Sequence, residues 1–297
     1  MLRLFSALFL LFGLQRISAS HWSYPDRDLN EAFPNWGGIC DTGKRQSPIN
    51  LSKDKSLKGV FDKLKFENFN ERQNGVTLVN NGHSIVLSNF SKQMEVKGGP
   101  LLDEYVVEQL HLHWWSEHTI NNMRYPLEVH IVSRNKRYAN VSMATNFKEG
   151  LTVIGVLYHV SNERSEAIEQ IIEHLQDVKD YEKLDQPAHM KQSFVVRQLF
   201  PKLNGYITYS GSLTTPSCAE AVTWIILSET FPVTLAQVDS FKDTHYEANK
   251  VLKSNYRDIQ KSYNRPVIFV DDVVGAANHM QVSVGAIIFM FIAIKFM

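Results

Sequence analysis

The chain has 297 residues, of which 44% are hydrophobic and 21% are charged, and its formal net charge is zero. That is enough apolar material to bury one large core or two small ones. The balanced charge, with no strongly basic patch, argues against nucleic acid as a partner.

The first twenty residues predict a secretory signal peptide. They begin with Arg3, continue through an apolar run over residues 4–14, and end in small residues at 18–20. This is the order of regions in a cleaved export signal. A buried N-terminal helix is the alternative, but the run has no polar face. The mature domain is therefore expected to cover residues 21–278, without an internal repeat or linker.

The middle of the chain predicts strands over residues 75–79, 84–87, 108–114, 127–132 and 152–160. These segments are short and rich in Val, Ile, Leu and aromatic residues, and turn-forming residues separate them. Residues 222–227 form a further apolar run. Apolar residues at helical spacing predict a helix over 165–178, and a shorter helix is expected near 235–244. The pattern indicates a sheet-dominated, mainly β domain with peripheral helices.

Two of the predicted strands carry three histidines that can meet. His111 and His113 alternate along the first strand, so both side chains lie on one face and the leucines between them on the other. His130 lies on the second strand and can reach the first two if the strands are neighbours. Three neutral imidazoles around one point form an open zinc site, in which the fourth position holds water. Zinc lowers the pKa of that water to about 7.

Gln109 and Glu128 each precede one of these histidines by two residues on the same strand face. They are placed to accept the second ring N–H of a liganding histidine, which fixes its orientation. A His-x-His pair alone is weak evidence, because both histidines can also be ordinary core or surface residues. A buried carboxylate without a partner is costly, however, so the position of Glu128 favours the metal site.

Two cysteines and three sequons agree with export. Cys40 and Cys218 are the only cysteines, and two lone cysteines in an exported chain usually pair, with two free thiols as the alternative. Asn50, Asn89 and Asn140 each begin an Asn-x-Ser sequon and are candidate glycosylation sites.

The C-terminus ends in a second apolar run over residues 282–294, which is shorter than the ~20 residues that span a membrane. Small residues at 275–278 precede it, so residues 279–297 resemble a removable signal for a GPI anchor attached at Gly275 to Asn278. A short transmembrane tail and a helix packed on the domain are the alternatives. A GPI anchor would place the domain at the extracellular face of the plasma membrane.

Spaced motifs in this order resemble those of the α-class carbonic anhydrases of the extracellular, membrane-anchored type. The motifs are His21-Trp22-Ser23-Tyr24, Gln46-Ser47-Pro48-Ile49-Asn50, Asn80-Asn81-Gly82-His83, the His-x-His strand, Ser116-Glu117-His118-Thr119, Glu128-Val129-His130, Gly211-Ser212-Leu213-Thr214-Thr215-Pro216 and Asn264-Arg265-Pro266. The resemblance implies a single domain around a large, mostly antiparallel twisted sheet. It also implies reversible hydration of carbon dioxide to bicarbonate by a zinc-bound hydroxide.

The resemblance assigns roles to individual residues. His111, His113 and His130 match the Zn²⁺ ligands, and His83 matches the histidine that shuttles protons. Thr214 matches the residue that orients the hydroxide, and Glu117 the acceptor of the Thr214 hydroxyl. The family also pairs cysteines at the positions of Cys40 and Cys218. The remaining matches line the substrate pocket: Tyr24, Asn81, Val132, Val153, Leu213, Thr215, Val222 and Trp224.

Three positions depart from the family pattern. Trp115 stands where glycine is usual, and its large ring is expected to alter packing near the histidine strand. Ser217 replaces a frequent second proline, and Val86 replaces a frequent amide in the pocket wall. No ligand is lost, which argues against the inactive, binding-only members of the family. A different zinc hydrolase, such as an esterase, is the other alternative, but no hydrolase motif is present.

Overall fold

The computed structural model describes residues 22–271. The predicted signal peptide at 1–20 and the hydrophobic tail at 279–297 therefore lie outside the described residues. Within residues 22–271, no helix combines the length and the apolar character needed to cross a membrane.

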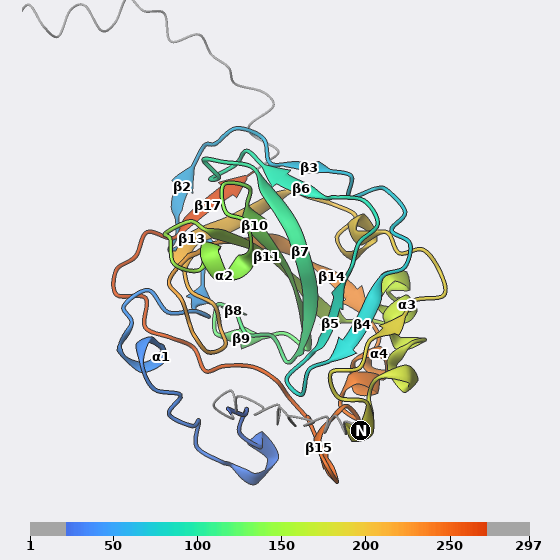
Figure 1. Cartoon of the computed structure of the whole chain (residues 1–297). Coiled ribbons are helices and arrows are strands. Elements are labelled where there is room, and N and C mark those ends of the chain that lie inside the picture. Colours follow the sequence, from blue (N-terminus) through green and yellow to red (C-terminus); the bar gives the residue numbers. More distant parts are fainter. Residues whose placement is uncertain (1–21, 272–297) are drawn as a thin grey trace, which may run out of the picture.

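A mixed sheet of twelve strands runs through the molecule, and helices lie at its periphery (Figure 1). Ten strands follow one another in the order β12-β4-β5-β7-β10-β11-β14-β13-β17-β2, and β6 joins β3 to β7. The strands are β2 (Leu57–Gly59), β3 (Lys65–Glu67), β4 (Thr77–Asn80), β5 (Ile85–Ser88), β6 (Glu95–Lys97), β7 (Tyr105–Trp114), β10 (Leu127–Asn135), β11 (Leu151–Val160), β12 (Ala188–His189), β13 (Gly205–Gly211), β14 (Val222–Val233) and β17 (Ile268–Asp271).

Most neighbouring strands are antiparallel, and β11–β14 and β17–β2 are the parallel pairs of this sheet. The expectation of a mainly β domain around a large, mostly antiparallel sheet is thus confirmed. Two small sheets complete the strands. One contains β1 (Asn50–Leu51), β8 (Thr119–Ile120) and β9 (Met123–Arg124), and the other β15 (His245–Glu247) and β16 (Lys250–Val251).

The helices are short. They are α1 (Ile39–Thr42), α2 (Val141–Ala144), α3 (Glu166–Ile172) and α4 (Leu235–Phe241), with 3-10 turns at Arg27–Leu29, Leu175–Asp177, Tyr181–Lys183 and Val196–Leu199. The prediction of one helix over 165–178 is therefore wrong in its second half. The buried ring of His174 hydrogen-bonds back to the carbonyl of Gln170 and accepts the backbone N–H of Lys191. These contacts hold His174 outside the helical region, so the chain continues as a 3-10 turn.

The two faces of β7 and β10 carry different side chains, and this decides on which face of the sheet the site lies. Leu110 and Leu112 of β7 and Val129 of β10 are fully buried in the larger hydrophobic cluster. The histidines that alternate with them lie on the opposite face. A second, smaller cluster that includes Val153, Val222 and Trp224 packs on that side. The sheet therefore has a dry core on one face and a site with mixed polar and apolar residues on the other.

Candidate active site

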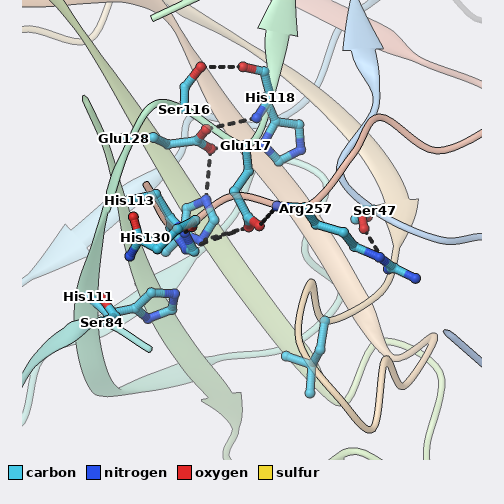
Figure 2. Close-up of polar contacts among 12 residues, drawn as sticks. Ser47, Ser84, His111, His113, Ser116, Glu117, His118, Glu128, His130 and Arg257 are labelled. Atoms are coloured by element: carbon cyan, nitrogen blue, oxygen red, sulfur yellow. Dashed lines mark hydrogen bonds and ion pairs between the residues drawn. The ribbon is translucent and has the colours of Figure 1, made fainter. Parts of the chain in front are cut away.

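Three imidazoles converge on the face of the sheet opposite the larger core. β7 and β10 pair antiparallel, and the register sets His111 directly opposite His130 and His113 opposite Glu128. Nitrogen atoms of His111, His113 and His130 all lie within 4.8 Å of one another. His113 and His130 are 1% exposed, whereas His111 is partly open. The meeting of the three rings, predicted from strand alternation, is present, and the close-up in Figure 2 shows them.

One nitrogen of each ring is already engaged on the side away from its neighbours. Nδ1 of His111 lies 3.0 Å from Oε1 of Gln109, and Nδ1 of His113 lies 2.5 Å from the carbonyl oxygen of Asn255. Nε2 of His130 lies 2.7 Å from Oε1 of Glu128. Nε2 of His111, Nε2 of His113 and Nδ1 of His130 therefore remain for a common cation.

The surroundings of His111 and His113 favour neutral rings. Burial lowers the pKa of His111 well below its ordinary value and that of His113 below it too, and the neighbouring imidazoles reinforce the effect. Neutral imidazole is the form that binds a metal. Nε2 of His113 is buried and has no hydrogen-bond partner among the described residues. A zinc ion fits this donor set, because it prefers nitrogen ligands and three of them leave a tetrahedral position open.

A buried chain of hydrogen bonds supports Glu128 from behind. The carboxylate also lies 2.8 Å from Nδ1 of His118 and accepts the backbone N–H of His118 (Figure 2). Nε2 of His118 lies 2.7 Å from the hydroxyl of Tyr209, which donates to Oγ of Ser47. Burial alone would raise the pKa of Glu128, but His118 and His130 outweigh it and hold that pKa well below its usual value.

His118, Glu128 and His130 form a second close group of potential ligands. Here the facing atoms already bind one another, so the geometry indicates a support for the three-histidine site. Gly155 leaves the space that this supporting group occupies. It pairs with His130 across β10 and β11, and a Cβ at this position would lie 2.5 Å from Cδ1 of Ile226 and 3.1 Å from Oε1 of Glu128.

Glu117 faces the same centre from the loop after β7. Its Oε1 accepts the backbone N–H of Arg257, and its Oε2 lies 3.5 Å from Nε2 of His113 and 3.9 Å from Nδ1 of His130. Oε2 has no hydrogen-bond donor among the described residues. The predicted bond from Thr214 is thus not formed in this structure, because the carboxylate is turned toward the imidazoles. Thr214 is buried, and Thr215 is half-buried.

His83 lies on the rim, in the turn between β4 and β5. Its ring stacks on Trp22, with ring centroids 3.6 Å apart and planes 11° from parallel. Oδ1 of Asn81 accepts the backbone N–H groups of His83 and Ser84 and so shapes the turn. Tyr24 is buried next to this pair, and burial raises the pKa of its hydroxyl well above its ordinary value.

The predicted apolar wall is assembled in one place. Val132, Val153, Val222 and Trp224 belong to the smaller hydrophobic cluster, and Leu213 packs against it. The ring of Trp224 lies 4.8 Å from that of His130, so the wall borders the histidine cluster directly. Val86 pairs with His111 across β5 and β7 and adds an apolar side chain on that flank.

Trp115 does not disturb the histidine strand, contrary to expectation. Its φ of 68° lies in the left-handed region, which explains why glycine suits this position. The side chain is 42% exposed and lies under the ammonium of Lys242, 5.9 Å from the ring centroid. Ser217 is exposed and follows a cis peptide bond after Pro216.

The disulfide between Cys40 and Cys218 is present and confirms the pairing. Asn50, Asn89 and Asn140 are all exposed. Asn140 caps α2, and Nδ2 of Asn89 donates to the carbonyl of Gly75. Their glycosylation stays a prediction.

The sequence did not indicate two residues of the site, Asn255 and Arg257. Asn255 binds the backbone of Trp114, Leu112 and His83 as well as the ring of His113, yet it lies in an irregular segment near the C-terminus. Arg257 lies two residues later, in the same segment. No local pattern marks either one, because their partners are more than a hundred residues away in the sequence.

Comparisons with known proteins agree with this geometry. Residues 31–271 match the family described as eukaryotic-type carbonic anhydrase. The chain is 32% identical to carbonic anhydrase 6 of Homo sapiens over 281 residues, covering 88% of this chain and 86% of the relative. It is 31% identical to the Mus musculus protein of the same name, covering 86% and 83%. It is also 32% identical to putative carbonic anhydrase 3 of Caenorhabditis elegans, covering 84% and 98%. The chain therefore belongs to the eukaryotic-type carbonic anhydrase family, whose enzymes hydrate carbon dioxide.

Proposed function

We propose that the chain catalyses zinc-dependent, reversible hydration of carbon dioxide to bicarbonate and a proton, with His83 as the proton shuttle. The observation that carries the proposal is the orientation of the three imidazoles. Each has its outer nitrogen bound by Gln109, Asn255 or Glu128, and the inner nitrogens lie within 4.8 Å of one another. Ligands fixed in this way need little reorganisation to hold a cation.

His111, His113 and His130 would hold the zinc ion, which supplies Lewis acidity and lowers the pKa of a water in its open position to about 7. Glu128 keeps the ring of His130 in place by binding its Nε2. His118 and Tyr209 hold Glu128 in turn. The chain thus contributes a pre-organised set of nitrogen donors beside a shielded carboxylate.

Thr214 and Glu117 are proposed to orient the attacking oxygen. Oε2 of Glu117 is buried without a donor among the described residues, which makes it the proposed acceptor of the Thr214 hydroxyl hydrogen. The Thr214 oxygen then acts as acceptor toward the attacking oxygen and directs its lone pair at the substrate. The apolar wall of Val132, Val153, Leu213, Val222 and Trp224 suits a small nonpolar substrate such as carbon dioxide.

His83 is proposed to move the proton between the site and solvent. Its ring lies on the rim, stacked on Trp22, and an unperturbed imidazole exchanges protons near neutral pH. Tyr24 and Asn81 flank it and are proposed to order the connecting waters. Because the Asn81 carbonyl oxygen is used by the turn, its amide nitrogen is the group left for water.

The enzyme is proposed to work at the outer cell surface, tethered by a C-terminal lipid anchor. The disulfide and three exposed sequons support an exported protein. Phosphatidylinositol-specific phospholipase should release the protein from expressing cells. Retention on the cells would favour a transmembrane tail, and secretion without treatment would argue against any anchor.

The catalytic proposal is tested on protein purified from cells that express the full chain. Zinc content and carbon dioxide hydration are measured together, before and after removal of metal by a chelator. We expect about one zinc per chain, loss of activity on chelation, and recovery with added zinc. Metal-free protein without activity would instead indicate a binding module, and activity that survives chelation would contradict the zinc mechanism.

A further inference from the structure

Arg124 binds the main chain beside Glu117, although its side chain is not among those that face the three histidines. It ends the short strand β9, and β7 is joined to Glu117 by Trp115 and Ser116 alone. Nη1 of Arg124 donates to the carbonyl oxygens of Ser116 and Glu117, the second at 3.3 Å. The guanidinium therefore lies against the peptide groups that carry the Glu117 side chain.

The carbonyl of Glu117 depends on this arginine more than its neighbours do. The backbone N–H groups of Trp115 and Ser116 donate to carbonyl oxygens of the segment just before β10. Within residues 22–271, the carbonyl of Glu117 accepts a hydrogen bond from Arg124 alone. Loss of the guanidinium would thus free the peptide group on the C-terminal side of Glu117, while the residues before it stay held.

The same guanidinium contacts the segment that binds the other end of Glu117. It lies over the ring of Tyr256, 3.9 Å from the ring centroid. Tyr256 stands between Arg257, whose backbone N–H donates to Oε1 of Glu117, and Asn255, whose carbonyl oxygen lies 2.5 Å from the ring of a proposed zinc ligand. Arg124 therefore joins the two segments of the chain that fix this carboxylate.

The segment around Tyr256 is itself well anchored. A second guanidinium, that of Arg27, lies 4.7 Å from the centroid of the Tyr256 ring, and its Nη2 lies 2.6 Å from Oδ1 of Asp258. Nη1 of Arg257 donates to the buried carbonyl of Ser47 at 2.8 Å. Arg124 thus connects the Glu117 loop to a part of the chain that is held independently.

The position of Glu117 matters because its two oxygens have different tasks. Oε1 accepts the backbone N–H of Arg257, as Figure 2 shows, and Oε2 is the proposed acceptor of the Thr214 hydroxyl. A displacement of the Glu117 peptide moves Oε2 relative to Thr214. The attacking oxygen then loses part of its orientation, to which the rate of attack is sensitive.

We propose that Arg124 is a positioning residue for the attack on carbon dioxide, which it supports by holding Glu117 in place through the main chain and through Tyr256. The inference rests on the proposed function, in which Glu117 and Thr214 orient the attacking oxygen. A planar guanidinium suits this task, because it donates to carbonyl oxygens and stacks on an aromatic ring at the same time.

The test uses the zinc-loaded full chain and the variants Arg124→Ala and Arg124→Met, the second of which keeps a long side chain without donors. The matched control is Arg197→Ala. Arg197 is also half-buried and stacks on an aromatic ring, that of Phe200, but Phe200 belongs to the larger hydrophobic cluster on the other face of the sheet. Zinc content, kcat and kcat/KM for hydration are measured for each protein.

We expect kcat/KM to fall roughly tenfold in both Arg124 variants, with zinc content unchanged. The ratio kcat/KM covers binding and attack, whereas proton release follows the departure of bicarbonate and enters kcat alone. Concentrated imidazole buffer should therefore not restore kcat/KM. Arg197→Ala should leave zinc content and kcat/KM at the wild-type values.

A double variant separates positioning from general damage to the fold. Glu117→Gln keeps an acceptor for Arg257 and loses the acceptor for Thr214. In this background Arg124→Met should lower kcat/KM by less than about twofold further, because two residues that act through one group are not additive.

Three outcomes would overturn the proposal. One is an unchanged kcat/KM in a folded Arg124→Met protein. Another is an equal loss with and without Glu117→Gln, which would indicate a general structural role. The third is loss of zinc, which would place the effect on the metal ligands. A zinc-loaded wild-type protein without hydration activity would contradict the proposed function instead, and it is recognised before any variant is compared.

Discussion

On the inner side of the active site His113, His130, Glu117 and Glu128 are at most 1% exposed, whereas on the rim His83 is half-buried and Asn81 is exposed. The inner residues lie on paired strands or just after them, and each has one side-chain atom held by a hydrogen bond within the protein. The rim residues lie in a turn held by local hydrogen bonds. The metal ligands thus gain fixed geometry from burial, while the proposed shuttle keeps the access to water that proton exchange needs.

The largest effect on zinc binding and on activity is expected from replacing a buried ligand on the inner side of the site. His130→Ala removes one of three zinc ligands from a buried position, so bound zinc should be lost and hydration should fall by at least roughly three orders of magnitude. Zinc content by mass spectrometry and stopped-flow hydration measure this. His159→Ala, an exposed histidine on β11, is the control and should leave both unchanged. A zinc-loaded His130→Ala protein would contradict the ligand assignment.

A substitution on the rim should slow turnover without removing metal. In weak buffer His83→Ala should lower the maximal rate by roughly a hundredfold, because proton transfer to solvent then lacks its relay. Concentrated imidazole buffer should restore part of the rate, and zinc content should stay at the wild-type value. His189→Ala, an exposed histidine on β12, is the control. Unchanged turnover in weak buffer would refute the shuttle role.

Replacing Glu128, which holds a ligand in place, should reduce zinc binding less than replacing a ligand itself. Glu128→Gln keeps the shape but replaces a carboxylate that faces both His118 and His130. We expect zinc affinity to fall by about 10–100-fold, measured by competition with a chromophoric chelator. Glu108→Gln, on the neighbouring strand and paired with Arg134, serves as the control. Equal zinc affinity in both variants would show that Glu128 does not tune the site.

The smallest effect is expected on the stability of the domain, through the packing around Gly155. Gly155→Ala adds a methyl group 2.5 Å from Cδ1 of Ile226, so the domain should lose about 1–3 kcal/mol of unfolding free energy. Ile226→Val removes that atom and should recover part of the loss in the double variant. Thermal unfolding of the zinc-loaded protein measures both. A fully stable single variant would show that the strands can separate there without strain.

The sequence predicted the residues of the site better than it predicted the strands of the sheet. Alternation along residues 108–114 and 127–132 predicted which histidines share a face, and the register of β7 and β10 agrees. β13 was missed, although it is mostly buried between β14 and β17, because Tyr, Thr and Ser interrupt its apolar run. β2, β3, β6 and β17 were missed because each has only three or four residues. Their pairing with distant strands, rather than local propensity, makes them strands.

The sequence by itself determined the candidate ligands and their spacing, the cysteine pair, and the motifs that indicate the family, because each is a local or compositional pattern. Only the tertiary structure decided that Asn255 and Arg257 complete the site, that Trp22 stacks on His83, and that Trp115 lies at the surface. Each of these depends on contacts between segments far apart in the chain, and local periodicity carries no information about such contacts.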